Sequence, residues 1–357
     1  MPGSGPYAQV KNILAEAVTR GAVGLHFSVG NNPVLWVNGE INEVAGQELV
    51  TQSFMESFVA ELLSAEQKKN LEDNREIVLT HNFDKNLRFK VSVFFQRGFL
   101  SATLRFISTI VPTLASLGLN PMLKELVQLN SGLIIVSGSF GSGRSTTVAA
   151  IIEEINQTRR KYIITIEDPI EYIFTNQKSI IEQREVGRDT KSFADALNYF
   201  QEEDGDALFL EEIRDPEIIP ALLEVARSGA LVLTTLSASS AANTVSRILD
   251  SFKTFDQARI KDLLATALKA VICQKMIPKI GGGNIVVQEI MLVNDAIQSI
   301  ILNGSAAQID NIIQTSRKEG MLGFDQQLAE LVSQNKITLK DALDNAANRN
   351  VLENLAR

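Results

Sequence analysis

The chain has 357 residues, of which 45% are hydrophobic and 21% are charged, and its formal net charge is −8. This composition is typical of a folded protein of two or three domains and argues against intrinsic disorder. The single cysteine, Cys273, excludes an intrachain disulfide scaffold and a cysteine zinc module, and two histidines argue against a histidine metal site. The acidic balance argues against nucleic acid as a partner.

The excess of acidic residues lies after residue 118. Residues 1–118 carry 10 Lys and Arg against 11 Asp and Glu, whereas the remainder carries 24 against 31. The first residues show no basic region followed by an apolar run, so we expect no signal peptide, and no apolar run approaches the ~18 residues that span a bilayer. We therefore expect a cytoplasmic protein, with a peripheral membrane partner left open.

Residues 1–108 predict a small α+β domain with a mostly antiparallel sheet. Strands are expected over 23–29, 33–37, 77–80, 87–93 and 101–106, with turns at Asn38-Gly39 and Arg97-Gly98. A helix is expected over 48–63, and another is indicated by apolar residues at helical spacing: Val10, Ile13, Leu14, Ala17 and Val18. We expect His26 to be structural, His81 to lie at the surface end of a strand, and Trp36 to serve packing.

Residues 109–118 predict a linker, and beyond Pro121 strands alternate with helices. Strands are expected at 133–136, 162–166, 207–210 and 231–236, and helices at 145–156, 192–200 and 217–227. This alternation predicts an α/β fold with a parallel sheet and crossover helices over 119–290. The pattern after Met291 is helical, so we expect a helical region over 291–357. Cys273 lies in an apolar stretch that we interpret as helical and buried.

A glycine-rich segment between a predicted strand and a predicted helix has the spacing of a phosphate-binding loop. Its glycines let backbone N–H groups converge on phosphate oxygens at a helix N-terminus. Ser145 is placed to coordinate Mg²⁺. Arg144 stands where lysine is expected, and its larger planar group does not fit the same slot. A turn without a ligand is the alternative to a nucleotide site made by Gly138, Ser139, Phe140, Gly141, Ser142, Gly143, Arg144, Ser145 and Thr146.

Carboxylates follow two of the predicted core strands, where the ligand crevice of an open α/β sheet lies. Glu167, Asp168 and Glu171 follow the strand at 162–166, and a capped turn before a proline is their alternative role. Glu212 follows the apolar strand at 207–210, as in a Walker B strand. We predict that it polarises the attacking water and acts on the metal indirectly, while the metal neutralises phosphate charge.

These segments together resemble the type IV pilus retraction ATPases, the PilT-like branch of the secretion ATPase superfamily, from about residue 8 to the C-terminus. The segments that carry the resemblance are 25–28, 94–98, the phosphate loop, 165–171, 183–190, 212–215 and 318–321. The resemblance implies a PAS-like N-terminal domain, a RecA-like ATPase domain, ATP or ADP with Mg²⁺ at subunit interfaces of a homo-hexamer, and an inner-membrane pilus platform protein as partner. It also implies that Arg97, Arg105, Arg184 and Arg188 are candidates for contacting a neighbour's nucleotide; ordinary surface or ion-pair arginines are the alternative.

The chain departs from the family pattern around the expected catalytic site. Besides Arg144, Ser237 stands where the family has histidine, Glu202 where arginine is common, and Glu211 where glycine is usual. Residues 296–301 keep only the apolar skeleton of a segment associated with retraction. These changes predict reduced ATP hydrolysis. Three interpretations remain: an active motor, a degenerate paralogue and a nucleotide sensor. The degenerate paralogue would regulate or scaffold a true retraction motor, in a ring of its own or in a mixed ring.

Overall fold

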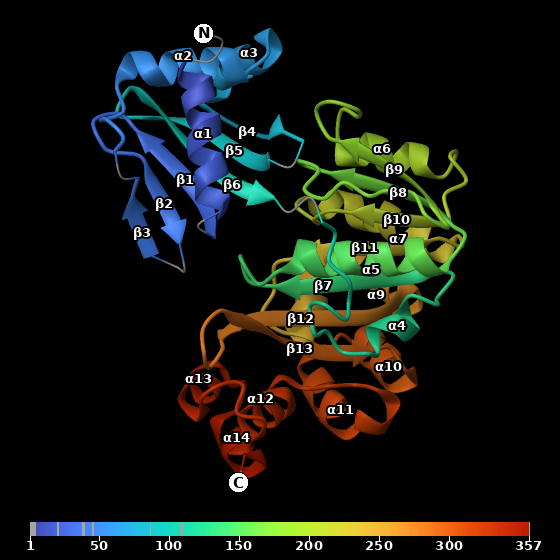
Figure 1. Cartoon of the computed structure of the whole chain (residues 1–357). Helices are drawn as coiled ribbons and strands as arrows, with labels where there is room; N and C mark the ends of the chain where they lie inside the picture. Colours follow the sequence, from blue (N-terminus) through green and yellow to red (C-terminus); the bar gives the residue numbers. More distant parts are fainter. Residues whose placement is uncertain are drawn as a thin grey trace. The chain divides into compact units, whose positions relative to one another are not determined.

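A computed structural model describes residues 5–19, 21–37, 40–44, 46–85, 87–107 and 110–356 (Figure 1). It contains two compact units. The N-terminal unit comprises residues 1–110 together with 168–173, and the C-terminal unit comprises 111–167 together with 174–357. The predicted turn at Asn38-Gly39 and the start of the predicted linker lie outside the described residues.

The N-terminal unit contains a six-stranded sheet in which every neighbouring pair is antiparallel, in the order β3-β2-β1-β6-β5-β4. This agrees with the predicted antiparallel sheet, and it adds β3, which the sequence pattern did not indicate because all four of its residues are exposed. The strands are β1 (Ala22–Ser28), β2 (Val34–Val37), β3 (Glu40–Glu43), β4 (Glu76–Asp84), β5 (Leu87–Gln96) and β6 (Phe99–Ile107).

Three helices bury one face of this sheet: α1 (Pro6–Thr19), α2 (Gln52–Leu62) and α3 (Ala65–Asn74). Alternate strand residues such as Leu25 and Phe27 pack against them, since successive side chains of a strand point to opposite faces. The single helix expected over 48–63 begins later than predicted, because Thr51 accepts a hydrogen bond from the Phe54 amide and caps α2. Ser64 and Gln67 form a capping box that starts α3.

The two histidines of the N-terminal unit are both half-buried, and each is hydrogen-bonded to a hydroxyl group. The His26 Nδ1 lies 2.9 Å from the Thr103 hydroxyl, which fits the predicted structural role. His81 was predicted at a strand end, and this is wrong: it lies in the middle of β4, half-buried, with Nε2 2.6 Å from the Tyr7 hydroxyl. The reason is that β4 is longer than the apolar run 77–80 suggested, and that α1 covers its continuation.

The C-terminal unit contains a seven-stranded sheet in the order β13-β12-β7-β11-β10-β8-β9. Six strands run parallel, and β13 is antiparallel at one edge. The strand–helix alternation predicted a parallel sheet and four of these strands, β7, β8, β10 and β11, but it did not indicate β9 or β12. The strands are β7 (Gly132–Gly138), β8 (Tyr162–Glu167), β9 (Ile180–Glu185), β10 (Ala207–Leu210), β11 (Leu231–Leu236), β12 (Leu268–Pro278) and β13 (Asn284–Leu292).

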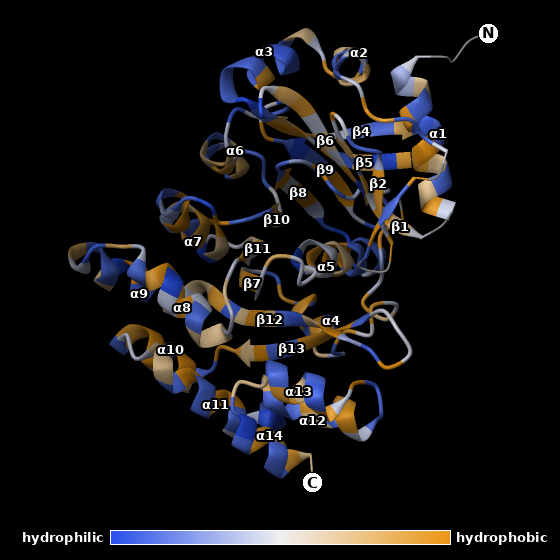
Figure 2. Cartoon of the chain, turned by 90° about the vertical axis from the view of Figure 1, so that its left-hand side faces the viewer, coloured by the Kyte–Doolittle hydropathy of each residue, from blue (hydrophilic) through white to orange (hydrophobic). Residues whose placement is uncertain are grey.

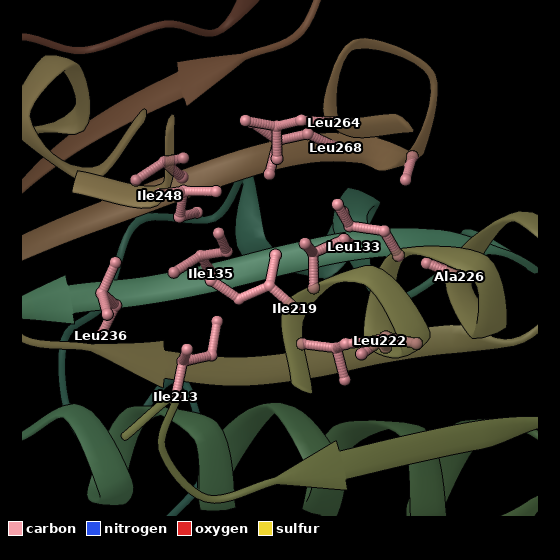
Figure 3. Close-up of a cluster of buried hydrophobic side chains, with 14 of the residues drawn as sticks. Leu133, Ile135, Ile213, Ile219, Leu222, Ala226, Leu236, Ile248, Leu264 and Leu268 are labelled. Carbon is pink, nitrogen blue, oxygen red and sulfur yellow. The ribbon is translucent and has the colours of Figure 1, made fainter. Parts of the chain in front are cut away.

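Helices cover both faces of this sheet. Ile134 and Val136 of β7 pack toward α4 (Leu123–Leu126) and α5 (Arg144–Thr158). Leu133 and Ile135 point to the other face, where Figure 3 shows them among side chains of the helices that follow β10 and β11. Those helices are α7 (Ile219–Arg227), α8 (Ala241–Asp250) and α9 (Thr254–Ala267), with α6 (Phe193–Phe200) completing the layer.

The stretch containing Cys273 was predicted to be helical, and this is wrong. Cys273 lies on β12, fully buried, and packs against Phe324 and Leu328 of the C-terminal helices. The interpretation failed because β12 is apolar on both faces, being buried between layers, so the run lacks the alternation by which a strand is recognised. Burial raises the pKa of its thiol to about 12.

The chain after β13 is helical, as predicted. These helices gather beyond the β13 edge of the sheet in Figure 1, and those that are visible in Figure 2 mix hydrophilic and hydrophobic residues, as expected of helices with one buried side. They are α10 (Asp295–Asn303), α11 (Ile309–Thr315), α12 (Phe324–Ser333), α13 (Leu339–Asn345) and α14 (Arg349–Leu355). Among the described residues, no helix has the length and apolar character needed to cross a bilayer.

Candidate functional site

The phosphate loop connects the carboxyl end of β7 to the N-terminus of α5. Gly138 ends the strand, and Gly141 and Gly143 have φ angles of +79° and +85°. Only glycine adopts such angles at little cost, so the sequence spacing allows the chain to turn back and start α5 at Arg144. Ser145 and Thr146 occupy the first turn of that helix. The predicted strand–loop–helix context of the loop is therefore present.

The loop arginine is bound to the expected catalytic glutamate. Arg144 Nη1 lies 3.0 Å from Glu212 Oε1, and the two side chains are 14% and 28% exposed. The second Glu212 oxygen lies 3.8 Å from Arg214 Nε. The Arg144 guanidinium therefore occupies a carboxylate oxygen that would otherwise be available to orient a water.

The carboxyl end of β10 is fixed by its neighbours. The Glu211 amide donates to the Ile166 carbonyl at 3.0 Å, and the Thr235 hydroxyl donates to the Glu211 carbonyl at 2.6 Å. These contacts tie the residue before Glu212 to both flanking strands, so the position of Glu212 is set by the sheet. Glu202, which the resemblance aligns with an arginine, is exposed beyond α6.

The carboxylates after β8 are divided between the two units. Glu167 is buried in the C-terminal unit, where Oε1 accepts hydrogen bonds from the Thr165 hydroxyl at 2.6 Å and from Gln183 Nε2 at 3.1 Å. Asp168 begins the segment 168–173 of the N-terminal unit.

In the N-terminal unit, this segment is held by basic side chains of β5. Glu171 Oε1 lies 2.9 Å from Lys90 Nζ, and Arg88 Nη2 donates to the Ile170 carbonyl at 2.8 Å. Glu171 is therefore a partner of the N-terminal sheet in this structure. Sequence reasoning missed Lys90, because the pair spans 81 positions and nothing in a local pattern indicates it.

The four candidate arginines occupy different surroundings. Arg184 lies on β9 with Nη1 3.0 Å from Glu203 Oε1, whereas Arg188 is 77% exposed and 3.9 Å from Asp189. Arg97 has a φ angle of +51° in the turn between β5 and β6, and Arg105 is exposed on β6. Arg97 and Arg105 belong to the N-terminal unit, and Arg184 and Arg188 to the C-terminal unit.

A cavity of about 490 Å³ lies beside the phosphate loop, within the C-terminal unit. Ser139 of the loop and Ser237 after β11 both line it, together with Asn243, Arg247 and Asp250 of α8. Arg247 Nη1 donates to the Ser237 carbonyl at 2.6 Å, which fixes the backbone of this segment. Ser237, which the resemblance aligns with a histidine, therefore lines the same cavity as the phosphate loop.

A second cavity, of about 700 Å³, lies behind the loop that carries Ser237, where Ser239 and Ser240 line it. At its base, Glu289 of β13 is only 6% exposed, and its Oε1 accepts a 2.6 Å hydrogen bond from the Ala241 amide at the N-terminus of α8. Burial, the largest cause, acts with the charges of Asp310 and Asp325 to raise the pKa of Glu289 to about 7, against the lowering effects of the Ala241 amide and Lys275.

This buried carboxyl predicts a pH dependence of stability. Its pKa rises from 4.5 in the unfolded chain to about 7 in the fold, so the folded state binds the additional proton. The contribution of Glu289 to the free energy of unfolding is fully present below about pH 4.5 and is lost as the pH rises through 7. Each unit of pKa difference corresponds to ~1.4 kcal/mol. Glu289→Gln keeps the acceptor for Ala241 without the charge. We expect the variant to gain about 2 kcal/mol over wild type between pH 5 and 8 in urea unfolding.

The control for this prediction is Glu224→Gln, at a carboxylate that is 44% exposed. We expect its stability relative to wild type to be the same at pH 5 and pH 8. If the difference in free energy of unfolding between Glu289→Gln and wild type stays constant from pH 5 to pH 8, the raised pKa of Glu289 is contradicted.

Comparison with known proteins places these features in one family. A profile of the family described as "Type II/IV secretion system protein" matches residues 5–284. The type IV pilus retraction ATPase PilT of Pseudomonas aeruginosa PAO1 is 34% identical over 94% of this chain and 98% of its own length. The type IV pilus ATPase PilU of the same strain is 33% identical over 96% and 90%.

Solved structures agree with the sequence relatives. A crystal structure of the pilus retraction motor PilT with bound ADP superposes with a TM-score of 0.87 at 36% identity, covering 97% of this chain and 99% of that one. The Legionella pneumophila ATPase DotB superposes with a TM-score of 0.81 at 22% identity, covering 96% of each chain, and shows a shared fold. The match confirms the predicted fold class: an N-terminal domain followed by a RecA-like ATPase domain with a helical C-terminus.

The predicted resemblance is likewise confirmed, because both the family profile and near-full-length relatives support it. The chain belongs to the type II/IV secretion system protein family, and within it to the PilT-like type IV pilus retraction ATPases.

Proposed function

We propose that this chain is a PilT-like motor subunit that binds ATP and hydrolyses it slowly. The observation that carries the proposal is the 3.0 Å ion pair between Arg144 and Glu212. This ion pair joins Glu212, the carboxylate that would act on the attacking water, to Arg144, the cation that would neutralise phosphate charge. Ser237 adds to this effect, because a serine hydroxyl lacks the titratable nitrogen of the family's histidine.

The nucleotide is ATP or ADP with Mg²⁺. Support comes from the loop, where a Cβ on Gly138 would lie 2.5 Å from the Gln274 carbonyl oxygen, so only glycine fits the cradle. No group of three or more acidic, histidine or cysteine side chains suited to a metal occurs in the described part of the chain. The proposed ion is held mainly by phosphate oxygens, with Ser145 as protein ligand and Glu212 acting indirectly. Glu167, Asp168 and Glu171 complete the proposed acidic set.

The assembly we propose is a homo-hexamer with nucleotide at its subunit interfaces. Arg97, Arg105, Arg184 and Arg188 are the candidates for contacting a neighbour's nucleotide. Residues 1–108 form the PAS-like domain, 109–118 the linker, 119–290 the ATPase core and 291–357 the C-terminal helical region. The ring is cytoplasmic and peripheral to the inner membrane, where it acts on a pilus platform protein.

A degenerate paralogue is the second candidate function, favoured by the same ion pair and by the similarity to PilU alongside PilT. In that case the chain regulates or scaffolds a true retraction motor, in a ring of its own or in a mixed ring with that motor. A nucleotide sensor without hydrolysis is the limiting case of this candidate.

Deletion of the gene in its source organism tests the proposal. A motor subunit predicts loss of twitching motility and accumulation of surface pili, both restored by the wild-type gene. The mass of the purified chain with ATP is measured alone and mixed with a paralogous PilT. Assembly only in the mixture supports the second candidate. A hexamer of this chain alone fits both, and its rate of ATP turnover then separates a motor from a scaffold. Normal twitching and no ring in either sample would contradict both.

A further inference from the structure

Gln274 is a buried polar residue next to the phosphate loop that sequence reasoning did not single out. It lies on β12, fully buried, and its register partner on the parallel strand β7 is Gly138, the first glycine of the loop. Gln274 directly follows the apolar run 270–273, and a buried amide is costly unless both of its polar ends are bonded. The sequence shows a glutamine next to an apolar stretch, but it does not show which groups the amide contacts.

Both ends of the Gln274 amide bind the loop and the helix that follows it. Nε2 donates to the Ser142 carbonyl at 2.7 Å, and Oε1 accepts from the Thr147 hydroxyl at 3.0 Å. Thr147 is 1% exposed on α5, and its amide donates to the Gly143 carbonyl at 3.0 Å. One side chain thus connects the last part of the loop to the first turns of α5.

These contacts have a direct consequence for phosphate binding. A loop that points its N–H groups at an anion turns its carbonyl groups toward the protein, where each carbonyl needs a donor. Gln274 supplies that donor to Ser142, next to Gly143 at the start of α5. A donor supplied by the protein limits the conformations that the loop can adopt, which lowers the free-energy cost of ordering it around a nucleotide.

We propose that Gln274 is a positioning residue that holds the phosphate loop in its nucleotide-binding shape. The inference rests on the proposed nucleotide binding and goes beyond it by assigning a role to a residue on β12 that does not itself contact the ligand. A purely structural residue at this place would change stability without changing nucleotide affinity.

The test compares Gln274→Leu with a matched variant, Gln288→Leu. Gln288 faces Gln274 across the β12–β13 pair and is 1% exposed, but its Oε1 accepts from the Asn120 amide at 3.1 Å, away from the loop. Both variants lose a buried amide from the same sheet. The affinity of the full-length chain for a fluorescent ADP analogue is measured well below the unfolding temperature of each variant.

We expect Gln274→Leu to weaken ADP binding at least tenfold, the scale of leaving one buried carbonyl unpaired, and Gln288→Leu to change it less than about twofold. Thr147→Val removes only one of the two contacts, is nearly isosteric, and provides a milder variant should Gln274→Leu not fold. We expect about a threefold loss for it. Equal affinities for wild type, Gln274→Leu and Thr147→Val would overturn the inference and leave nucleotide binding intact. No binding by wild type would overturn both.

Discussion

Replacing Arg144 by lysine together with Ser237 by histidine is expected to raise the ATPase rate of the purified chain at least tenfold. Arg144 holds Glu212 at 3.0 Å through one guanidinium nitrogen, whereas lysine carries a compact ammonium of different geometry. Freed from this pair, Glu212 can act on water and the ammonium can meet the phosphates. One such transition-state contact is worth about 10²–10³ in rate at other enzymes. The histidine restores a titratable group at the cavity that Ser237 and Ser139 line.

Arg159→Lys is the matched control for the arginine change. Arg159 lies at the other end of α5, where Nη1 donates to the Val127 and Leu129 carbonyls at 2.8 and 2.6 Å. The same chemical replacement on the same helix is expected to leave the rate within about twofold, because it touches no group of the site. If the double variant hydrolyses ATP no faster than wild type, the ion pair does not limit turnover and the defect lies elsewhere, in Glu202 or in assembly.

Gly138→Ala is expected to destroy nucleotide binding and to destabilise the fold. The added Cβ would lie 2.5 Å from the Gln274 carbonyl oxygen and closer still to the Ser142 hydroxyl, and the φ angle of +155° already disfavours a side chain. Because β7 and β12 are paired here, the strands cannot separate without breaking the sheet. Overpacking of this kind costs about 1–3 kcal/mol. We expect a lower midpoint in urea unfolding and no measurable ADP binding by calorimetry.

The control for this variant is Gly229→Ala in the same unit. Gly229 has a φ angle of +123°, and a Cβ there would meet nothing within 4 Å, so the change adds backbone strain without a clash. Such strain costs about 1–3 kcal/mol and lies away from the loop. We expect Gly229→Ala to keep its ADP affinity. Equal ADP affinities for Gly138→Ala and wild type would contradict the close packing of β7 and β12 at the loop.

The parts of the site that a local pattern specifies were predictable from the sequence. Glycine spacing after an apolar strand indicated the phosphate loop, because the left-handed φ angles of Gly141 and Gly143 need glycine. The apolar run before Glu211 and Glu212 indicated β10, because a strand buried on both faces between turns has this composition. Strand–helix alternation likewise specified the parallel sheet.

The parts that depend on long-range contact were not predictable. The Arg144–Glu212 pair joins residues 68 positions apart, and the sequence showed both residues as anomalies without showing that they meet. The Lys90–Glu171 pair joins residues 81 positions apart, so a carboxylate assigned to the catalytic set from its motif was not seen to bind β5. β12 was misread as helical because burial on both faces removes the alternation on which the assignment depends.

Calorimetric nucleotide binding and ATP turnover, measured on one preparation of the wild-type chain, test the central claim most directly. The claim is that the site binds nucleotide but hydrolyses it slowly because Arg144 holds Glu212. It predicts saturable binding of ATP and ADP with Mg²⁺, together with a turnover far below ~1 per second, the lower end of ordinary enzyme rates. A turnover of ~1 per second or more would contradict it.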